Sequence, residues 1–157
     1  MTSELFNPKE LDQSHLPPLA LGLKKKVLII DDHPESVSLL RFSLGRWGFK
    51  TKVVCDGYDA IIEMVMHNYD LIVIDWVMPE MSGLQTLIQA NKSVSLDPKT
   101  DPKSPHKRQI PVVVYSSYQP DLKSLENLDH FRVIGHWNKA QKFRSILSHV
   151  YDTIMSI

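Results

Sequence analysis

The chain has 157 residues with 18 basic (Lys and Arg) and 18 acidic (Asp and Glu) residues, so its formal net charge is zero. This length suits a single domain with one core, and the charge balance gives no sign of nucleic-acid binding. No apolar run is long enough to span a membrane, and the N-terminus does not resemble a signal peptide. Cys55 is the single cysteine, which excludes an internal disulfide. We therefore expect a cytoplasmic protein in which Cys55 is a small buried residue.

Residues 1–24 contain three prolines and no sustained periodicity, which is typical of a flexible tail. From residue 25 onward, short apolar runs alternate with segments of helical spacing. Residues 27–30 (VLII) predict a buried strand that ends at an acidic pair. Pro34 then fits the first turn of a helix. The apolar stripe and stop signal of that helix are Val37, Leu40, Leu44, Trp47 and Gly48.

The same alternation continues to the C-terminus. Strands are predicted at residues 49–55, 71–74, 111–115 and 131–137. The helices between and after them have the stripes Ala60, Ile61, Met64 and Val65; Leu84, Leu87 and Ile88; Leu122, Leu125 and Leu128; and Phe143, Ile146, Leu147, Val150 and Ile154. This order predicts an α/β fold, a doubly wound five-stranded parallel sheet with helices on both faces. Residues 94–109 are rich in proline and lysine and predict a long surface loop.

Polar residues follow four of the predicted strands, at the edge where the carboxyl ends of parallel strands meet. They are Asp31, Asp32, Asp75, Ser116 and Lys139. Three carboxylates at one edge repel one another, and a divalent cation such as Mg²⁺ removes that repulsion. A lysine and a hydroxyl at the same edge can bind the anionic oxygens of a phosphoryl group. Together these residues predict a Mg²⁺-dependent phosphoryl-transfer site with an aspartate as a possible nucleophile.

Four segments, VLIIDDHP, LIVIDWVMPEMSG, PVVVYSS and HWNKA, resemble the receiver domain of two-component response regulators. The resemblance covers residues 25–157 and implies the flavodoxin-like form of the fold. It implies that Asp75 is the phosphoacceptor, which receives a phosphoryl group from a sensor histidine kinase or a histidine phosphotransfer protein. It also implies that Asp32 and Asp75 ligate Mg²⁺ directly, that Asp31 acts through water, and that the backbone carbonyl of Val77 completes the protein ligands.

The resemblance assigns Lys139 and Ser116 to the phosphoryl oxygens, and two neighbouring positions depart from the family pattern. The lysine of the family is usually followed by proline, often in a cis peptide, whereas Ala140 predicts a trans bond. His136 occupies the switch position where Tyr or Phe is common. It can act as a rotating switch or be an ordinary half-buried strand histidine, and both interpretations stay open.

Two further positions bear on the lifetime of the acyl phosphate. In the family, the residues two positions after the acceptor and two positions after the serine influence attack by water. Here they are Val77 and Tyr118, neither of which readily orients a water molecule. We therefore predict slow self-dephosphorylation. His33 and Trp76, which flank the acids, are expected to be packing or rim residues.

The resemblance implies a signalling phosphoacceptor and not a metabolic enzyme. No output domain follows the last predicted helix, so we expect a stand-alone receiver that switches a surface of the last two strands and helices toward an output protein. Three alternatives stay open. One is an aspartyl-phosphate phosphatase, although Val77 stands where such enzymes carry a second aspartate. The others are a phosphorylation-independent binding module and a flavodoxin-like cofactor binder, which has no need of the acid cluster.

Overall fold

The computed structural model describes residues 25–95 and 109–142, with a few isolated positions beyond 142. The strands are β1 (Lys26–Ile30), β2 (Lys50–Val54), β3 (Leu71–Ile74), β4 (Ile110–Ser116) and β5 (Phe131–Asn138). The helices are α1 (Pro34–Arg46), α2 (Gly57–Met66), α3 (Gly83–Ser95) and the 3₁₀ helix η3 (Leu122–Leu125). The predicted tail, the loop after α3 and the apolar stripe of the closing helix lie outside the described residues. Helix α3 runs two residues into the segment predicted as loop.

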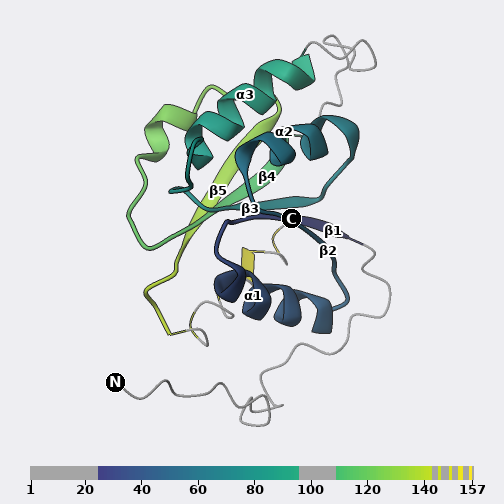
Figure 1. Cartoon of the computed structure of the whole chain (residues 1–157), viewed down its shortest axis with the longest axis vertical. Coiled ribbons are helices and arrows are strands. Elements are labelled where there is room, and N and C mark those ends of the chain that lie inside the picture. The colour runs from purple at the N-terminus through teal and green to yellow at the C-terminus, as the bar shows by residue number, and fades with distance from the viewer. Residues whose placement is uncertain are drawn as a thin grey trace.

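All five strands are parallel, in the order β2-β1-β3-β4-β5. This confirms the predicted doubly wound sheet. The chain leaves β1 for β2 on one side and returns to β3 on the other side. The loops that follow β1 and β3 therefore diverge, and the carboxyl ends of two such neighbouring strands are where doubly wound sheets bind their ligands. Figure 1 shows α1 on one face of the sheet and α2 and α3 on the other.

Side chains of each central strand alternate between two apolar layers, as a fully covered parallel sheet requires. The layer beneath α1, here called the α1-side cluster, comprises Val27, Ile29, Val37, Leu40, Leu44, Trp47, Phe49, Leu71, Val73, Val113, Tyr115 and Trp137. The layer beneath α2 and α3 comprises Leu28, Ile30, Val54, Ala60, Met64, Ile72, Ile74, Met78, Leu87, Ala90, Val112, Leu125, Leu128 and Phe131. The strands are thereby held rigidly on both sides, which fixes the residues at their ends.

The α-helix predicted between β4 and β5 is replaced by a shorter element in the structure. Only one 3₁₀ turn, η3, forms between β4 and β5, and Asp121 caps it by accepting a hydrogen bond from the Lys123 amide. Leu122, Leu125 and Leu128 are spaced by three residues, which matches the 3.0 residues per turn of a 3₁₀ helix better than the α-helical 3.6. Leu125 and Leu128 are nevertheless buried, so the apolar positions were predicted correctly.

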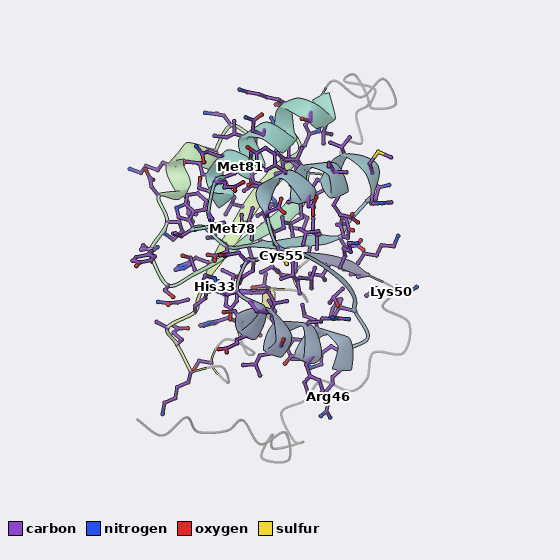
Figure 2. The ribbon with its side chains drawn as sticks, viewed as in Figure 1. His33, Arg46, Lys50, Cys55, Met78 and Met81 are labelled. Atoms are coloured by element: carbon purple, nitrogen blue, oxygen red, sulfur yellow. The ribbon has the colours of Figure 1, made fainter. Side chains whose placement is uncertain are left out.

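The prediction that Cys55 is buried is wrong, because the residue is exposed. Its side chain is labelled in Figure 2. Strand β2 lies at one edge of the sheet, and its pairing with β1 ends at the Ile30–Val54 pair. Cys55 follows that last pair, so no neighbouring strand covers it. In the described part of the chain, no helix is long and apolar enough to cross a bilayer.

Candidate functional site

Asp31 and Asp75 stand at the carboxyl ends of the two central strands, β1 and β3. The Asp75 amide donates to the carbonyl of Ile30 over 2.8 Å, and the Asp31 amide donates to the carbonyl of Val54 over 3.2 Å. These bonds extend the sheet by one residue beyond each strand. Both aspartates are buried, with 1% and 4% of their surface exposed. Buried carboxylates need a partner, since an isolated buried charge is costly.

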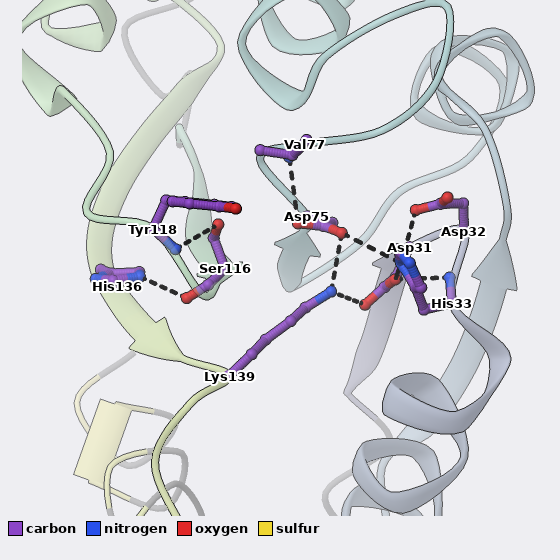
Figure 3. Close-up of polar contacts among 9 residues, drawn as sticks. All are labelled: Asp31, Asp32, His33, Asp75, Val77, Ser116, Tyr118, His136 and Lys139. Carbon is purple, nitrogen blue, oxygen red and sulfur yellow. Dashed lines mark hydrogen bonds and ion pairs between the residues drawn. The ribbon is translucent and has the colours of Figure 1, made fainter.

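Lys139 supplies that partner from the end of β5, on the far side of the sheet. Its Nζ lies 2.6 Å from Oδ2 of Asp31 and 2.8 Å from Oδ2 of Asp75, and so bridges the two carboxylates (Figure 3). The lysine side chain is itself only 12% exposed. The Lys139–Ala140 peptide bond is trans, as predicted, because the described residues contain no cis peptide. The ammonium group therefore holds together the ends of three strands.

Asp32 lies beside this pair but is differently placed. Its side chain is 22% exposed, yet its Oδ1 is buried and accepts no hydrogen bond from the described residues. The imidazole of His33 lies beside it, with Nδ1 3.0 Å from that oxygen, 3.5 Å from Oδ1 of Asp31 and 3.9 Å from Oδ2 of Asp75. His33 is at the rim, as expected. Its contact with all three acids was not predicted, although its place directly after the acidic pair was the available signal.

The four side chains of Asp31, Asp32, His33 and Asp75 place potential ligand atoms within 4.8 Å of one another. Carboxylate oxygens are the ligands that Mg²⁺ prefers, and the three aspartates provide them. The buried Oδ1 of Asp32, which lacks a hydrogen bond, is the kind of oxygen that a cation would satisfy. The residues present thus fit a magnesium ion. Val77, 53% exposed, donates its amide to Oδ1 of Asp75 over 3.2 Å, and the ligand role of its carbonyl stays a prediction.

Burial dominates the electrostatics of the site. It raises the pKa of Asp31 above the usual 3.8, and although the hydrogen bond from Lys139 opposes the rise, the nearby charge of Asp75 adds to it. The phenol of Tyr115, on β4, has a pKa raised to about 12 by burial and by the charges of the same two aspartates. Lys139 Nζ lies 4.9 Å from the centroid of the Tyr115 ring. This tyrosine was not predicted to belong to the site.

Ser116, Tyr118 and His136 form a second group at the ends of β4 and β5. Ser116 is 1% exposed, and its Oγ accepts a hydrogen bond from the amide of Tyr118 over 3.2 Å. His136 is half-buried, and its Nε2 lies 3.0 Å from the carbonyl oxygen of Ser116. Figure 3 shows this group on the β4 and β5 side of the Asp75–Lys139 pair. The predicted switch roles of Ser116 and His136 stay predictions.

Gly83, the first residue of α3, lies tightly against the backbone of the site. A Cβ atom at this position would stand 2.3 Å from the carbonyl oxygen of Asp75, which is far inside van der Waals contact. The Gly83 amide donates to the carbonyl of Trp76 over 3.1 Å. The absence of a side chain at Gly83 therefore lets the loop after β3 fold back onto the residues that carry the central carboxylate.

The sequence of the chain is similar to parts of known signalling proteins. Residues 27–101 match the family model of the response regulator receiver domain. The chain is 37% identical over 68 residues to the sensor protein EvgS of Escherichia coli strain K12, which covers 43% of this chain and 6% of that protein. It is 30% identical over 76 residues to the alkaline phosphatase synthesis transcriptional regulatory protein PhoP of Bacillus subtilis, covering 48% of this chain and 32% of that one.

The fold is similar to solved receiver structures. The response regulator protein TrrA of Thermotoga maritima, solved in complex with Mg²⁺ and BeF, has a TM-score of 0.59 and 22% sequence identity. The superposition covers 82% of this chain and 97% of that one. Because the chain spans about a third of PhoP and a much smaller part of EvgS, the likeness to these proteins concerns one of their segments.

Proposed function

We propose that this chain, whose residues 27–101 match the family model of the response regulator receiver domain, accepts a phosphoryl group on Asp75 in a Mg²⁺-dependent reaction. The donor is a phosphohistidine on a sensor histidine kinase or a histidine phosphotransfer protein. The main support is the position of Lys139, whose ammonium lies 2.8 Å from Oδ2 of Asp75. A buried acid beside a half-buried lysine at a strand end is oriented and charge-compensated, as a carboxylate nucleophile requires.

The chemistry follows from these positions. One oxygen of Asp75 forms a bond to phosphorus while the P–N bond to the donor imidazole breaks, and the electron pair of that bond stays on the imidazole nitrogen. Catalysis of phosphoryl transfer consists largely of positioning and of stabilising negative charge. Lys139 neutralises charge on the phosphoryl oxygens, and the Val77 amide, which donates to Oδ1 of Asp75, orients the carboxylate. A magnesium ion held by Asp31, Asp32 and Asp75 would bring the anionic phosphoryl group and the carboxylates together.

Phosphorylation then changes the contacts at the end of β4. The hydroxyl of Ser116, which accepts a hydrogen bond from the Tyr118 amide, turns to donate to a phosphoryl oxygen. His136 contacts the carbonyl of the same serine, so the rearrangement passes to β5 and the surface around it. Couplings of this kind typically amount to about 1–3 kcal/mol, enough to change the affinity for an output protein. The domain acts as a signalling phosphoacceptor and turns over only its own phosphoryl group.

The test is the intact mass of the chain after incubation with acetyl phosphate and MgCl₂. We expect a gain of one phosphoryl group that is lost in Asp75→Asn and in the presence of EDTA. The matched control is Asp129→Asn, which removes an exposed carboxylate at the opposite end of the sheet, just before β5. That variant should be phosphorylated like the wild type. An unmodified wild-type chain, or equal modification of Asp75→Asn, would contradict the assignment of Asp75.

A further inference from the structure

The aromatic ring of Tyr115 lies beneath the charged end of Lys139. Tyr115 is the penultimate residue of β4, and it is 5% exposed within the α1-side cluster. The Lys139 Nζ stands 4.9 Å from its ring centroid, within the distance at which the negative face of an aromatic ring attracts a cation. The ammonium group therefore has the two carboxylates of Asp31 and Asp75 as hydrogen-bond acceptors and an aromatic face as a third neighbour.

The backbone contacts of Lys139 do not by themselves place its ammonium. The Lys139 amide donates to the carbonyl of Ser116 over 3.1 Å, and the Ala140 amide donates to Oδ1 of Asn138 over 2.8 Å. These bonds fix the chain where it leaves β5. The ammonium, however, sits at the end of a flexible four-carbon stem, which can adopt many conformations in the absence of further contacts. Ala140 adds only a methyl group to the loop, so the position of the charge depends on what the stem and the ammonium touch.

We propose that Tyr115 is a positioning residue that holds the Lys139 ammonium between Asp31 and Asp75 through the face of its ring. Its importance for phosphoryl transfer rests on the proposed function, whereas its hold on Lys139 is a property of the unphosphorylated protein. The ring is itself fixed, because Tyr115 is packed among Val113, Trp137 and the rest of the α1-side cluster. A rigid surface under a flexible cation lowers the entropy that must be lost when the cation binds an anionic ligand.

The direct test observes the Lys139 side chain in the metal-free, unphosphorylated protein. Protons near the face of an aromatic ring are shifted upfield in NMR spectra, and the Lys139 signals are assigned by their absence in Lys139→Met. We expect the terminal methylene protons of Lys139 to be shifted upfield in the wild type and in Tyr115→Phe, and to move to ordinary lysine positions in Tyr115→Leu. Unchanged signals in Tyr115→Leu would overturn the proposal, whatever the protein does with acetyl phosphate.

A matched control separates this contact from general packing. Val113→Ala removes methyl groups from a fully buried side chain of the same cluster, two residues earlier on the same face of β4. It should lower stability while leaving the Lys139 signals in place. If Tyr115→Leu does not fold, 3,4,5-trifluorophenylalanine at position 115 keeps the ring volume but weakens its negative face. If the ring face attracts the ammonium, the Lys139 side chain should be more mobile in that protein. Unchanged Lys139 signals would show that the ring only fills space.

The functional readout is the rate of phosphorylation by acetyl phosphate and Mg²⁺. Tyr115→Leu should lower the rate by about 2- to 30-fold, the span that corresponds to cation–π attractions from exposed to desolvated sites. Tyr115→Phe, which keeps the ring, should retain the wild-type rate. In a Lys139→Met background the change at Tyr115 should have no further effect, since residues that act through one contact are not additive. Full additivity of the two substitutions would overturn the proposal, because a residue acting only on stability would slow both backgrounds equally.

Discussion

Removing the charge of Asp31 should make the metal-free protein more stable at neutral pH. Asp31 is 1% exposed, and burial is the main cause of its raised pKa, so the folded state disfavours the ionised form. The variant Asp31→Asn keeps the shape of the side chain and an oxygen that can accept the hydrogen bond from the His33 amide, which spans 2.8 Å in the wild type. The amide nitrogen then takes the place of Oδ2, so Lys139 loses its 2.6 Å bond to Asp31 and keeps its bond to Asp75.

The size of the gain is set by the desolvation of the carboxylate and by its repulsion from Asp75. Each unit by which folding raises a pKa corresponds to about 1.4 kcal/mol at a pH above both values. Replacing a whole buried ion pair with well-packed hydrophobic residues of similar volume is often neutral or stabilising by about 1–4 kcal/mol. Because one ion pair of the site survives in Asp31→Asn, we expect a gain in the lower part of that range, about 1–2 kcal/mol at pH 7.

The sign of the pH dependence follows from the same raised pKa. Between the unfolded value near 3.8 and the higher folded value, the native wild type binds more protons than the unfolded chain, so its stability falls as the pH rises through this window. The amide group that replaces this carboxyl group in Asp31→Asn does not titrate. The advantage of Asp31→Asn should therefore be full at neutral pH and vanish as the pH is lowered toward 3.8.

The measurement is urea unfolding of both proteins in EDTA at several pH values between 4 and 7. Lys139→Met gives the opposite expectation, a loss of about 3–5 kcal/mol at pH 7, because it leaves the buried carboxylates of Asp31 and Asp75 without their cation. Asp129→Asn, at an exposed position, should change little. A loss of stability in Asp31→Asn that does not depend on pH would refute the idea that the buried charge is unfavourable for folding.

Three further outcomes are expected. Gly83→Ala should lower stability by about 1–3 kcal/mol and slow phosphorylation, because its Cβ would lie 2.3 Å from the carbonyl oxygen of Asp75. Urea unfolding measures the stability, and the gain in mass over time measures the phosphorylation rate. An unchanged rate would contradict a role of Gly83 in placing Asp75. Val77→Asn should shorten the lifetime of the phosphorylated protein about tenfold, because the new amide orients water but does not transfer a proton, for which factors of ~10² or more are reached. The lifetime is measured by loss of the phosphoryl label, and a wild-type lifetime of seconds would exclude the slow hydrolysis predicted for Val77. Asp32→Asn should weaken Mg²⁺ binding by an order of magnitude or more, as followed by the fluorescence of the neighbouring Trp76, and equal Mg²⁺ affinity in both proteins would remove this aspartate from the ligand set.

Much of the fold was predictable because it depends on hydrophobic patterns within short stretches of the sequence. The apolar run 71–74 is buried on both faces and ends on an acid, and the β3 strand occupies those residues. The convergence of Asp31, Asp75 and Lys139 followed from the rule that parallel strands end at one edge, and these side chains do meet.

The contacts that sequence reasoning missed depend on where side chains turn after the backbone is placed. Nothing in the spacing of residues shows that the ring of Tyr115 lies under Lys139 or that the imidazole of His33 reaches Asp32. The same holds for Cys55, whose exposure depends on how far β2 remains paired with its neighbour. Local pattern predicts which face of a strand is apolar, whereas tertiary contacts decide which polar groups touch.

The bond between Lys139 and Asp31 joins residues 108 positions apart, and it connects the first strand of the sheet with the end of the last one. During synthesis on the ribosome, the acids at the ends of β1 and β3 emerge long before the lysine that compensates them. A nascent or truncated chain that ends before Lys139 therefore lacks the ammonium group that bridges Asp31 and Asp75. Under the proposed function, the orientation of the Asp75 carboxylate by Lys139 therefore waits until the whole sheet has been synthesised.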